Sequence, residues 1–175
     1  SMDVMFEFDK ERRKLITKEL NDKNLIIKLI QFRNDNPHLQ KSKYPLEMYD
    51  KVNLMCRAYM DRLARFEMDY DFEVDTDIFL NTAVCCLESF PQLHSQIIYH
   101  PVSPYWKVAD YNVNDFVTVK YTDDIEKERE EFFRRCIPLK SNIQMNIGLF
   151  FCKGKTYICF IWNHMLMDGG GFKMF

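Results

Sequence analysis

The segment from Ile143 to Trp162 constrains the fold of this 175-residue chain more than any other. Apolar side chains occupy every second position from Ile143 to Phe151, and a second strand-like run extends from Thr156 to Trp162. A period of two places successive side chains on opposite faces of a strand. Because the intervening Cys152-Lys153-Gly154-Lys155 contains the glycine of a tight turn, the sequence predicts a β-hairpin here.

A second alternating stretch, from Arg65 to Val74, predicts another strand with one buried face. Its apolar face carries five side chains: Phe66, Met68, Tyr70, Phe72 and Val74. Acidic residues alternate with them on the other face. These acids do not fit an EF-hand calcium loop, because the mid-loop glycine and the terminal glutamate are absent. A solvated strand face is therefore the favoured interpretation, and we expect no metal site.

Hydrophobic periodicity and turn residues predict the remaining elements. Helices are expected at 49–60, 76–89 and 123–136, and strands at 94–99, 106–108 and 116–120. From residue 65 onward the order is β-α-β-β-β-α-β-β. This order favours an α+β fold, a two-layer sandwich in which helices pack on one face of a mixed or largely antiparallel sheet.

The distribution of charge suggests a domain boundary. Residues 1–43 hold ten basic and seven acidic side chains, whereas residues 44–175 are net acidic. Apolar stripes in residues 1–43 predict two short helices, 10–20 and 24–33. We therefore interpret residues 1–43 as an accessory helical segment. The alternative is a small basic arm that binds a partner. The net charge of −2 and the pI near 6.1 provide no basic field for nucleic acid.

The six cysteines indicate a reducing compartment. No CxxC spacing exists, and no histidine lies at zinc-finger distance from a cysteine pair. Most of these cysteines stand in apolar runs, so we expect reduced, buried thiols in a cytoplasmic protein. No apolar run approaches the roughly 18 residues of a membrane span, and no signal peptide is visible.

The second hairpin strand leads directly into the sequence Trp162-Asn163-His164-Met165-Leu166-Met167-Asp168-Gly169-Gly170-Gly171. Three of only five glycines in the chain stand here. Histidine suits proton transfer near neutral pH. Glycine permits close backbone approach, and the Gly169 N–H is a candidate donor to a developing oxyanion. The alternative is a core histidine followed by an Asp-Gly turn.

This motif resembles the HxxxDG signature of the chloramphenicol-acetyltransferase-like, CoA-dependent acyltransferase superfamily, which includes condensation domains and alcohol acetyltransferases. The resemblance extends over residues 44–175. Tyr44-Pro45-Leu46 is similar to the start of a condensation domain, the segment 88–97 to the approach to its second strand, and Pro138-Leu139 with the hairpin to the approach to its histidine.

The resemblance implies roles for individual residues. His164 is expected to be the general base, and Asp168 a structural residue paired with an arginine. Arg57, Arg62 and Arg65 are the candidates for that arginine near the first strand. We also expect Trp162, Asn163 and Gly170 to contact substrate.

The implied function is transfer of an acyl group from a CoA or carrier-protein thioester to a hydroxyl or amine acceptor. The thioester, acyl-CoA or phosphopantetheine-linked, is a co-substrate, and no bound cofactor is expected. The expected partners are this donor, a small-molecule acceptor and a carrier protein. Because the family has two subdomains with a tunnel between them, we interpret residues 44–175 as the amino-terminal subdomain, ending just after the HxxxDG loop. A trimer with sites between subunits is a variant of this hypothesis.

Two departures from the family pattern bear on these roles. Condensation domains usually carry arginine where His94 aligns, which favours an alcohol- or polyketide-type relative. The usual second histidine before HxxxDG is here Asn163. A catalytically silent scaffold that binds a carrier or partner protein is therefore the alternative function. His94 and His100 are interpreted as satisfied core or surface histidines.

Overall fold

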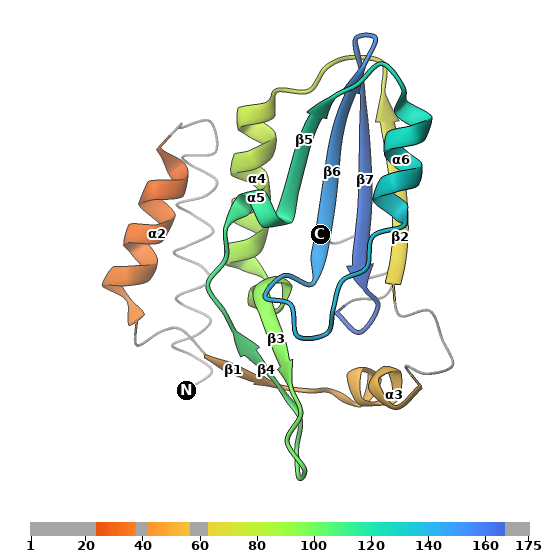
Figure 1. The fold of residues 1–175 in the computed structure, drawn as a ribbon. Helices are drawn as coiled ribbons and strands as arrows, with labels where there is room; N and C mark the ends of the chain where they lie inside the picture. Colours follow the sequence, from red (N-terminus) through yellow and green to blue (C-terminus); the bar gives the residue numbers. More distant parts are fainter. Residues whose placement is uncertain (1–23, 38–41, 57–62, 167–175) are drawn as a thin grey trace.

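The computed structural model of the protein describes residues 24–37, 42–56 and 63–166, in which two sheets and several helices pack together (Figure 1). The elements are, in order, α2 (Leu25–Asp35), β1 (Lys43–Pro45), α3 (Met48–Cys56), β2 (Leu63–Tyr70), α4 (Thr76–Ser89), the 3-10 helix η2 (Pro91–His94), β3 (Ser95–Ile98), β4 (Tyr105–Val108), α5 (Val113–Phe116), β5 (Val117–Tyr121), α6 (Ile125–Phe133), β6 (Met145–Cys152) and β7 (Lys155–Asn163).

The larger sheet has the strand order β2-β7-β6-β5. Strands β6 and β7 form the predicted hairpin, in which Cys152 lies opposite Lys155. Lys153 and Gly154 in its turn have positive φ angles of 52° and 76°. Two successive positive φ angles match the right-handed twist of a hairpin. Strand β2 runs antiparallel to β7 and β5 runs parallel to β6, so the sheet is mixed.

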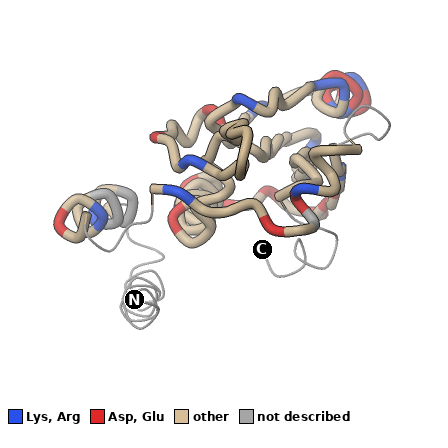
Figure 2. The backbone as a smooth tube through the Cα atoms, turned by 90° about the horizontal axis from the view of Figure 1, so that it is seen from below, with Lys and Arg blue, Asp and Glu red and all other residues tan. Residues whose placement is uncertain are grey.

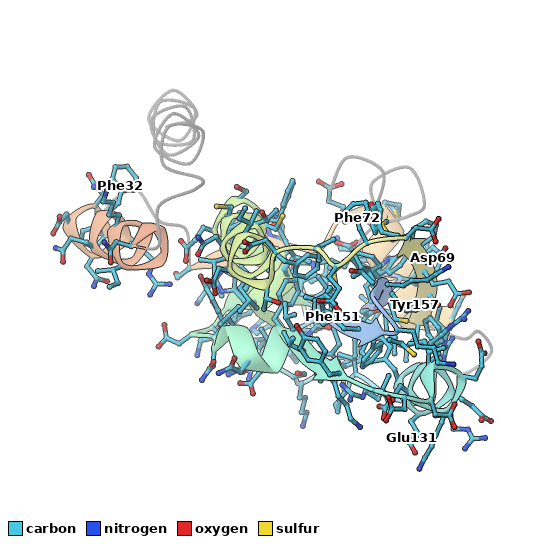
Figure 3. The ribbon with its side chains drawn as sticks, turned by 90° about the horizontal axis from the view of Figure 1, so that it is seen from above. Phe32, Asp69, Phe72, Glu131, Phe151 and Tyr157 are labelled. Atoms are coloured by element: carbon cyan, nitrogen blue, oxygen red, sulfur yellow. The ribbon has the colours of Figure 1, made fainter. Side chains whose placement is uncertain are left out.

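Helices α4 and α6 cover opposite faces of this sheet (Figure 3). On one face, Leu87 of α4 shares a core cluster with Leu149 of β6. On the other face, the ring of Phe132 in α6 lies 5.7 Å from the ring of Phe150 in β6. Adjacent residues of one strand thus enter separate cores, each closed by its own helix.

The α+β class with a mixed sheet is confirmed, but the helices do not all pack on one face as the sequence analysis expected. The physical reason is the composition of β6 and β7. Most positions of both strands are apolar and buried, not only every second one. Strands of this kind require cover on both faces.

The smaller sheet, β1-β4-β3, is antiparallel and lies near the end of β7. It forms its own cluster, in which Trp106 of β4 and Leu54 of α3 are buried together with Met165. Met165 directly follows His164 in the chain. The turn after β7 is therefore anchored in the core of the second sheet.

Helix α2 lies beside α4 (Figure 1). Its Arg33 forms an ion pair of 3.3 Å with Glu88 of α4, whose side chain is buried. The Tyr111 hydroxyl donates a hydrogen bond of 2.6 Å to the same carboxylate. Burial and the neighbouring Glu88 charge raise the pKa of Tyr111. The predicted helix 24–33 is thus confirmed, whereas the predicted helix 10–20 lies outside the described residues.

Charged side chains of both signs are interspersed along the described backbone (Figure 2). On α6, Arg129 pairs with Glu126 at 3.1 Å and with Glu67 of β2 at 2.5 Å. Lys155 pairs with Asp71 at 2.8 Å. Glu67 and Asp71 both belong to the acidic face of the β2 segment, so part of that face forms ion pairs. The interpretation of that face as an exposed, ionic surface is confirmed for both acids.

None of the six cysteines forms a disulfide, but only three of them are buried: Cys85, Cys152 and Cys159. Cys136 is exposed, contrary to the expectation of buried thiols. Within the described ranges, no helix combines the length and the apolar character needed to cross a bilayer.

Candidate functional site

Strand β7 ends at Asn163, and the following turn begins with His164. This strand is central in its sheet, with β2 on one side and β6 on the other, and every residue from Ile158 to Asn163 is buried. A strand held at both edges and on both faces is a rigid support for a functional group. His164 itself is half-buried.

Asn163 fixes the turn that carries His164. The Asn163 side chain is fully buried. Its Oδ1 accepts a hydrogen bond of 3.1 Å from the Met165 N–H, and its carbonyl oxygen accepts one of 2.8 Å from the Leu166 N–H. Asparagine is favoured in such turns because its short side chain reaches the backbone two residues further on.

A second fully buried amide, Gln144, joins Asn163 to the rest of the fold. Asn163 Nδ2 donates to Gln144 Oε1 at 3.2 Å, and the Asn163 N–H donates to the Gln144 carbonyl at 2.9 Å. Gln144 Nε2 then donates to the carbonyls of Ser95 at 2.9 Å and Ser141 at 2.8 Å. We call this the Gln144–Asn163 network. It ties the histidine turn to the start of β3.

Sequence reasoning did not identify Gln144, because it occupies an ordinary polar position of the alternating pattern between Ile143 and Met145. It did identify Asn163, but as a substrate contact. The structure places both polar side-chain atoms of Asn163 in the network just described, and Asn163 does not line the groove described next.

His164 lies at a large groove of about 1110 Å³ between β2 and α4. We call it the β2–α4 groove; it is lined by Ala64, Arg65, Phe66, Met68, Tyr70, Phe72, Val74, Phe79, Thr82, Ala83, Cys86, Ile147, Ile158, Phe160, Trp162 and His164. Trp162, predicted to contact substrate, is therefore in its wall. The groove as a whole was not predicted, because it depends on how α4 is placed over the sheet.

The β2 wall of the groove is apolar and unusually exposed. Phe66, Tyr70 and Phe72 keep 43%, 38% and 58% of their surface accessible. The sequence predicted this alternating face to be buried, and in that respect the prediction was wrong. Alternation shows which side chains share a face, but not whether another element covers them.

The polar groups of the lining are engaged within the protein. Arg65 Nε donates to the Phe133 carbonyl of α6 at 3.2 Å, on the far side of the sheet. The Thr82 hydroxyl donates to the Ile78 carbonyl of its own helix at 2.8 Å. Burial raises the pKa of Cys86 to about 11, so its thiol stays neutral at physiological pH. For proton transfer, the arrangement offers the imidazole of His164, a side chain suited to that role near neutral pH.

Several predicted site residues cannot be placed. Asp168, Gly169 and Gly170 lie outside the described residues, as do Arg57 and Arg62. The roles predicted for them remain predictions. Arg65, the remaining candidate partner for Asp168, is described and directs its guanidinium toward backbone carbonyls, including that of Leu63 at 3.2 Å.

His94 is a buried core residue, as interpreted from the sequence. Its Nδ1 lies 2.7 Å from the Ala109 carbonyl oxygen, and its ring packs 4.7 Å from the ring of Tyr111. Burial lowers the pKa of His94, with the Ala109 contact acting against the shift.

His100 is exposed in the loop between β3 and β4. Among the described residues, no three histidine, cysteine or acidic side chains gather where they would hold a metal ion.

Comparison with known families and with curated proteins by sequence finds no match. Comparison of the fold with solved structures does find matches. The protein is similar to the tallysomycin biosynthesis protein TlmII, with a TM-score of 0.64 and 12% identity over 75% of this chain and 36% of that chain.

Two condensation domains show the same likeness. The starter condensation domain of rhizomide synthetase RzmA matches with a TM-score of 0.62 and 12% identity, over 77% of this chain and 35% of that chain. The condensation domain of the monacolin K polyketide synthase MokA matches with a TM-score of 0.61 and 11% identity, over 70% of this chain and 30% of that chain.

These comparisons establish the fold. The described residues have the condensation-domain fold that the sequence resemblance implied. The chain spans about a third of the length of the structures that it matches.

Proposed function

We propose that the protein takes part in acyl transfer from a thioester donor to a hydroxyl or amine acceptor, with His164 as the general base. One observation carries the proposal: a histidine stands on the end of a rigid, buried strand and borders a groove large enough for a small-molecule ligand. The condensation-domain fold supports it, because an HxxxDG histidine after a strand is the feature that the sequence shares with this superfamily.

The proposed reaction requires one proton shuttle. The imidazole of His164 accepts the proton of the acceptor O–H or N–H as the acceptor atom attacks the thioester carbonyl carbon. The carbonyl electron pair moves onto oxygen and forms a tetrahedral oxyanion. When the carbonyl re-forms, the C–S bond breaks, and the departing thiolate takes the proton from the imidazolium. The products are the acylated acceptor and a free thiol, and His164 returns to its starting state.

Other residues of the motif have supporting roles in this proposal. The Gly169 N–H is proposed to stabilise the oxyanion, and Asp168 to hold the loop through an arginine. The Gln144–Asn163 network keeps the turn at His164 fixed, and Trp162 forms part of the wall beside it. Gly170 is retained as a proposed substrate contact.

The donor is proposed to be acyl-CoA or an acyl group on the phosphopantetheine arm of a carrier protein. Similarity to the starter condensation domain of a synthetase favours a carrier-bound thioester. The remainder of the site is proposed to come from a second subdomain.

The test is acyl transfer by the full-length protein with pantetheine thioesters as donors and a panel of alcohols and amines as acceptors. General bases of this kind contribute about 10²–10⁴-fold in rate, so His164→Ala should lower kcat by that factor. His100→Ala is the matched control, because His100 is exposed and is not among the residues that line the groove. Wild-type turnover in His164→Ala would overturn the general-base assignment. Retained binding of a carrier protein without any transfer would instead favour the silent scaffold.

A further inference from the structure

The walls of the β2–α4 groove differ in the size of their side chains. The β2 wall is aromatic, with Phe66 and Tyr70, whereas α4 contributes one aromatic residue, Phe79, followed by the smaller residues Thr82, Ala83 and Cys86. Larger residues at the last three positions would close onto the sheet. The small residues leave apolar volume between helix and strand, which is the form of a site for an apolar ligand.

The groove extends along the strands from His164. In β2, Ala64 lies opposite Trp162, next to the histidine, and Tyr70 lies opposite Thr156 near the hairpin turn. Six residues of extended strand cover about 20 Å. A ligand whose reacting carbonyl sits at His164 therefore has a path of this length between β2 and α4.

The far end of the groove is built by a specific contact. The buried Thr156 hydroxyl donates a hydrogen bond of 2.7 Å to the Phe72 carbonyl and accepts one of 3.0 Å from the Val74 N–H. This pair of bonds fastens the segment that carries Phe72 and Val74 to β7. Phe72 lies on the α4 side of the sheet in Figure 3. The groove therefore ends at a fixed point.

The charge of the residues that line the groove further restricts the chemical class of ligand that the groove can bind. No aspartate or glutamate lines the groove among the described residues. An aminoacyl group would place an α-ammonium next to apolar walls without a counterion, which is costly. A hydrocarbon chain has no such requirement, and each buried methylene is favourable.

We propose that the β2–α4 groove holds the hydrocarbon tail of a medium- or long-chain acyl thioester, with the carbonyl at His164 and the tail directed toward Phe72. This proposal rests on the proposed function for the position of the carbonyl. It assigns the donor to the fatty-acyl class rather than the aminoacyl class. Thr82, at the middle of the α4 wall, is then a residue that determines chain length.

The experiment measures binding separately from turnover. Unreactive thioether analogues of acetyl-, octanoyl- and dodecanoyl-pantetheine are titrated into the full-length protein by calorimetry. Affinity should rise by up to about fourfold per added methylene until the groove is filled. A second pair of analogues, leucyl and 4-methylpentanoyl, differs only by the α-ammonium, and the 4-methylpentanoyl form should bind more tightly.

A blocking variant locates the tail. Thr82→Phe fills the middle of the groove and should weaken dodecanoyl binding by about tenfold or more, while acetyl binding is unchanged. Thr82 is exposed, so the substitution does not disturb the core. Ile78→Phe is the control, because Ile78 is an exposed residue of the same helix outside the lining.

The outcomes separate the two proposals. Affinity that is independent of chain length, tighter binding of the leucyl analogue, or an unchanged dodecanoyl affinity in Thr82→Phe would each overturn the tail site, even in an active acyltransferase. The last result would mean that another segment of the protein covers the groove. Chain-length-dependent binding that Thr82→Phe abolishes supports the tail site even where no acceptor is acylated, and in that case only the proposed function fails.

Discussion

The Gln144–Asn163 network should control both stability and the position of His164, and Gln144→Leu tests this. Leucine has a similar volume to glutamine, so the substitution removes polar atoms and creates little cavity. It deletes three side-chain hydrogen bonds: one from Asn163 and two to the carbonyls of Ser95 and Ser141. The backbone hydrogen bonds of Gln144 remain.

The magnitude follows from the groups that the variant leaves unpaired. One amide N–H and two carbonyl oxygens lose their partner, in surroundings where Gln144 and Asn163 are fully buried. A buried polar group without a partner costs about 1–3 kcal/mol. Since Ser141 is only half-buried, we expect the free energy of unfolding to fall by about 3–5 kcal/mol.

Urea unfolding measures this loss, and Gln96→Leu is the matched control. Gln96 donates a single hydrogen bond to the exposed Asn142, so its loss should cost less than about 1 kcal/mol. In an acyl-transfer assay below the unfolding transition, Gln144→Leu should lower kcat by about 10–100-fold, because a small displacement of a catalytic group is costly. Equal destabilisation by the two variants would refute the reasoning, as would an unchanged kcat.

Two further predictions concern buried ionisable groups. Because the pKa of His94 is lowered in the folded protein, the unfolded chain binds a proton at this residue more readily than the folded chain does. The contribution of His94 to stability is therefore present above its unfolded pKa of about 6.5 and is lost as the pH falls below that value. Between pH 7.5 and 5.5 the free energy of unfolding should therefore fall more in wild type than in His94→Phe, and parallel pH profiles would contradict this. Arg33→Ala removes the cation paired with the buried Glu88 and should cost about 1–3 kcal/mol, part of which Glu88→Gln restores in the double variant. An unchanged unfolding midpoint in Arg33→Ala would favour the interpretation of residues 1–43 as accessory.

Most elements could be predicted from the sequence because their signals are local. Asp75 caps helix α4 by accepting from the Ile78 N–H at 3.0 Å, and the predicted bounds, Thr76–Ser89, are those observed. The hairpin likewise depends on its own turn. Its neighbours in the sheet, β2 and β5, are distant in sequence, and no local pattern specifies which edge each one occupies.

The site could be predicted only in part for the same reason. His164 was identified because motif and strand are contiguous in the chain. Gln144 could not be, since its partners include Ser95, which is 49 residues away. Local sequence patterns also could not predict which faces of the sheet are covered, because Phe150 and Leu149 are both apolar. Only the packing of two separate helices shows that both faces belong to hydrophobic cores.

The unexpected exposure of the aromatic face of the β2 segment connects the limits of the sequence analysis to the proposed function. Its acidic side has ionic partners, with Arg129 forming two hydrogen bonds to Glu67, whereas its aromatic side remains accessible at Phe66 and Phe72. Leaving apolar surface in water forgoes about 25 cal/mol for each Å² that burial would gain. The same helix covers the sheet at Leu87 and contributes Phe79 to the groove lining, but between them it has the small residues Ala83 and Thr82, where a larger apolar residue would have covered more of the aromatic row. In the β2 segment this exposed row lies beside β7, the strand that leads to His164, and a ligand that covers the row would recover the lost stabilisation there.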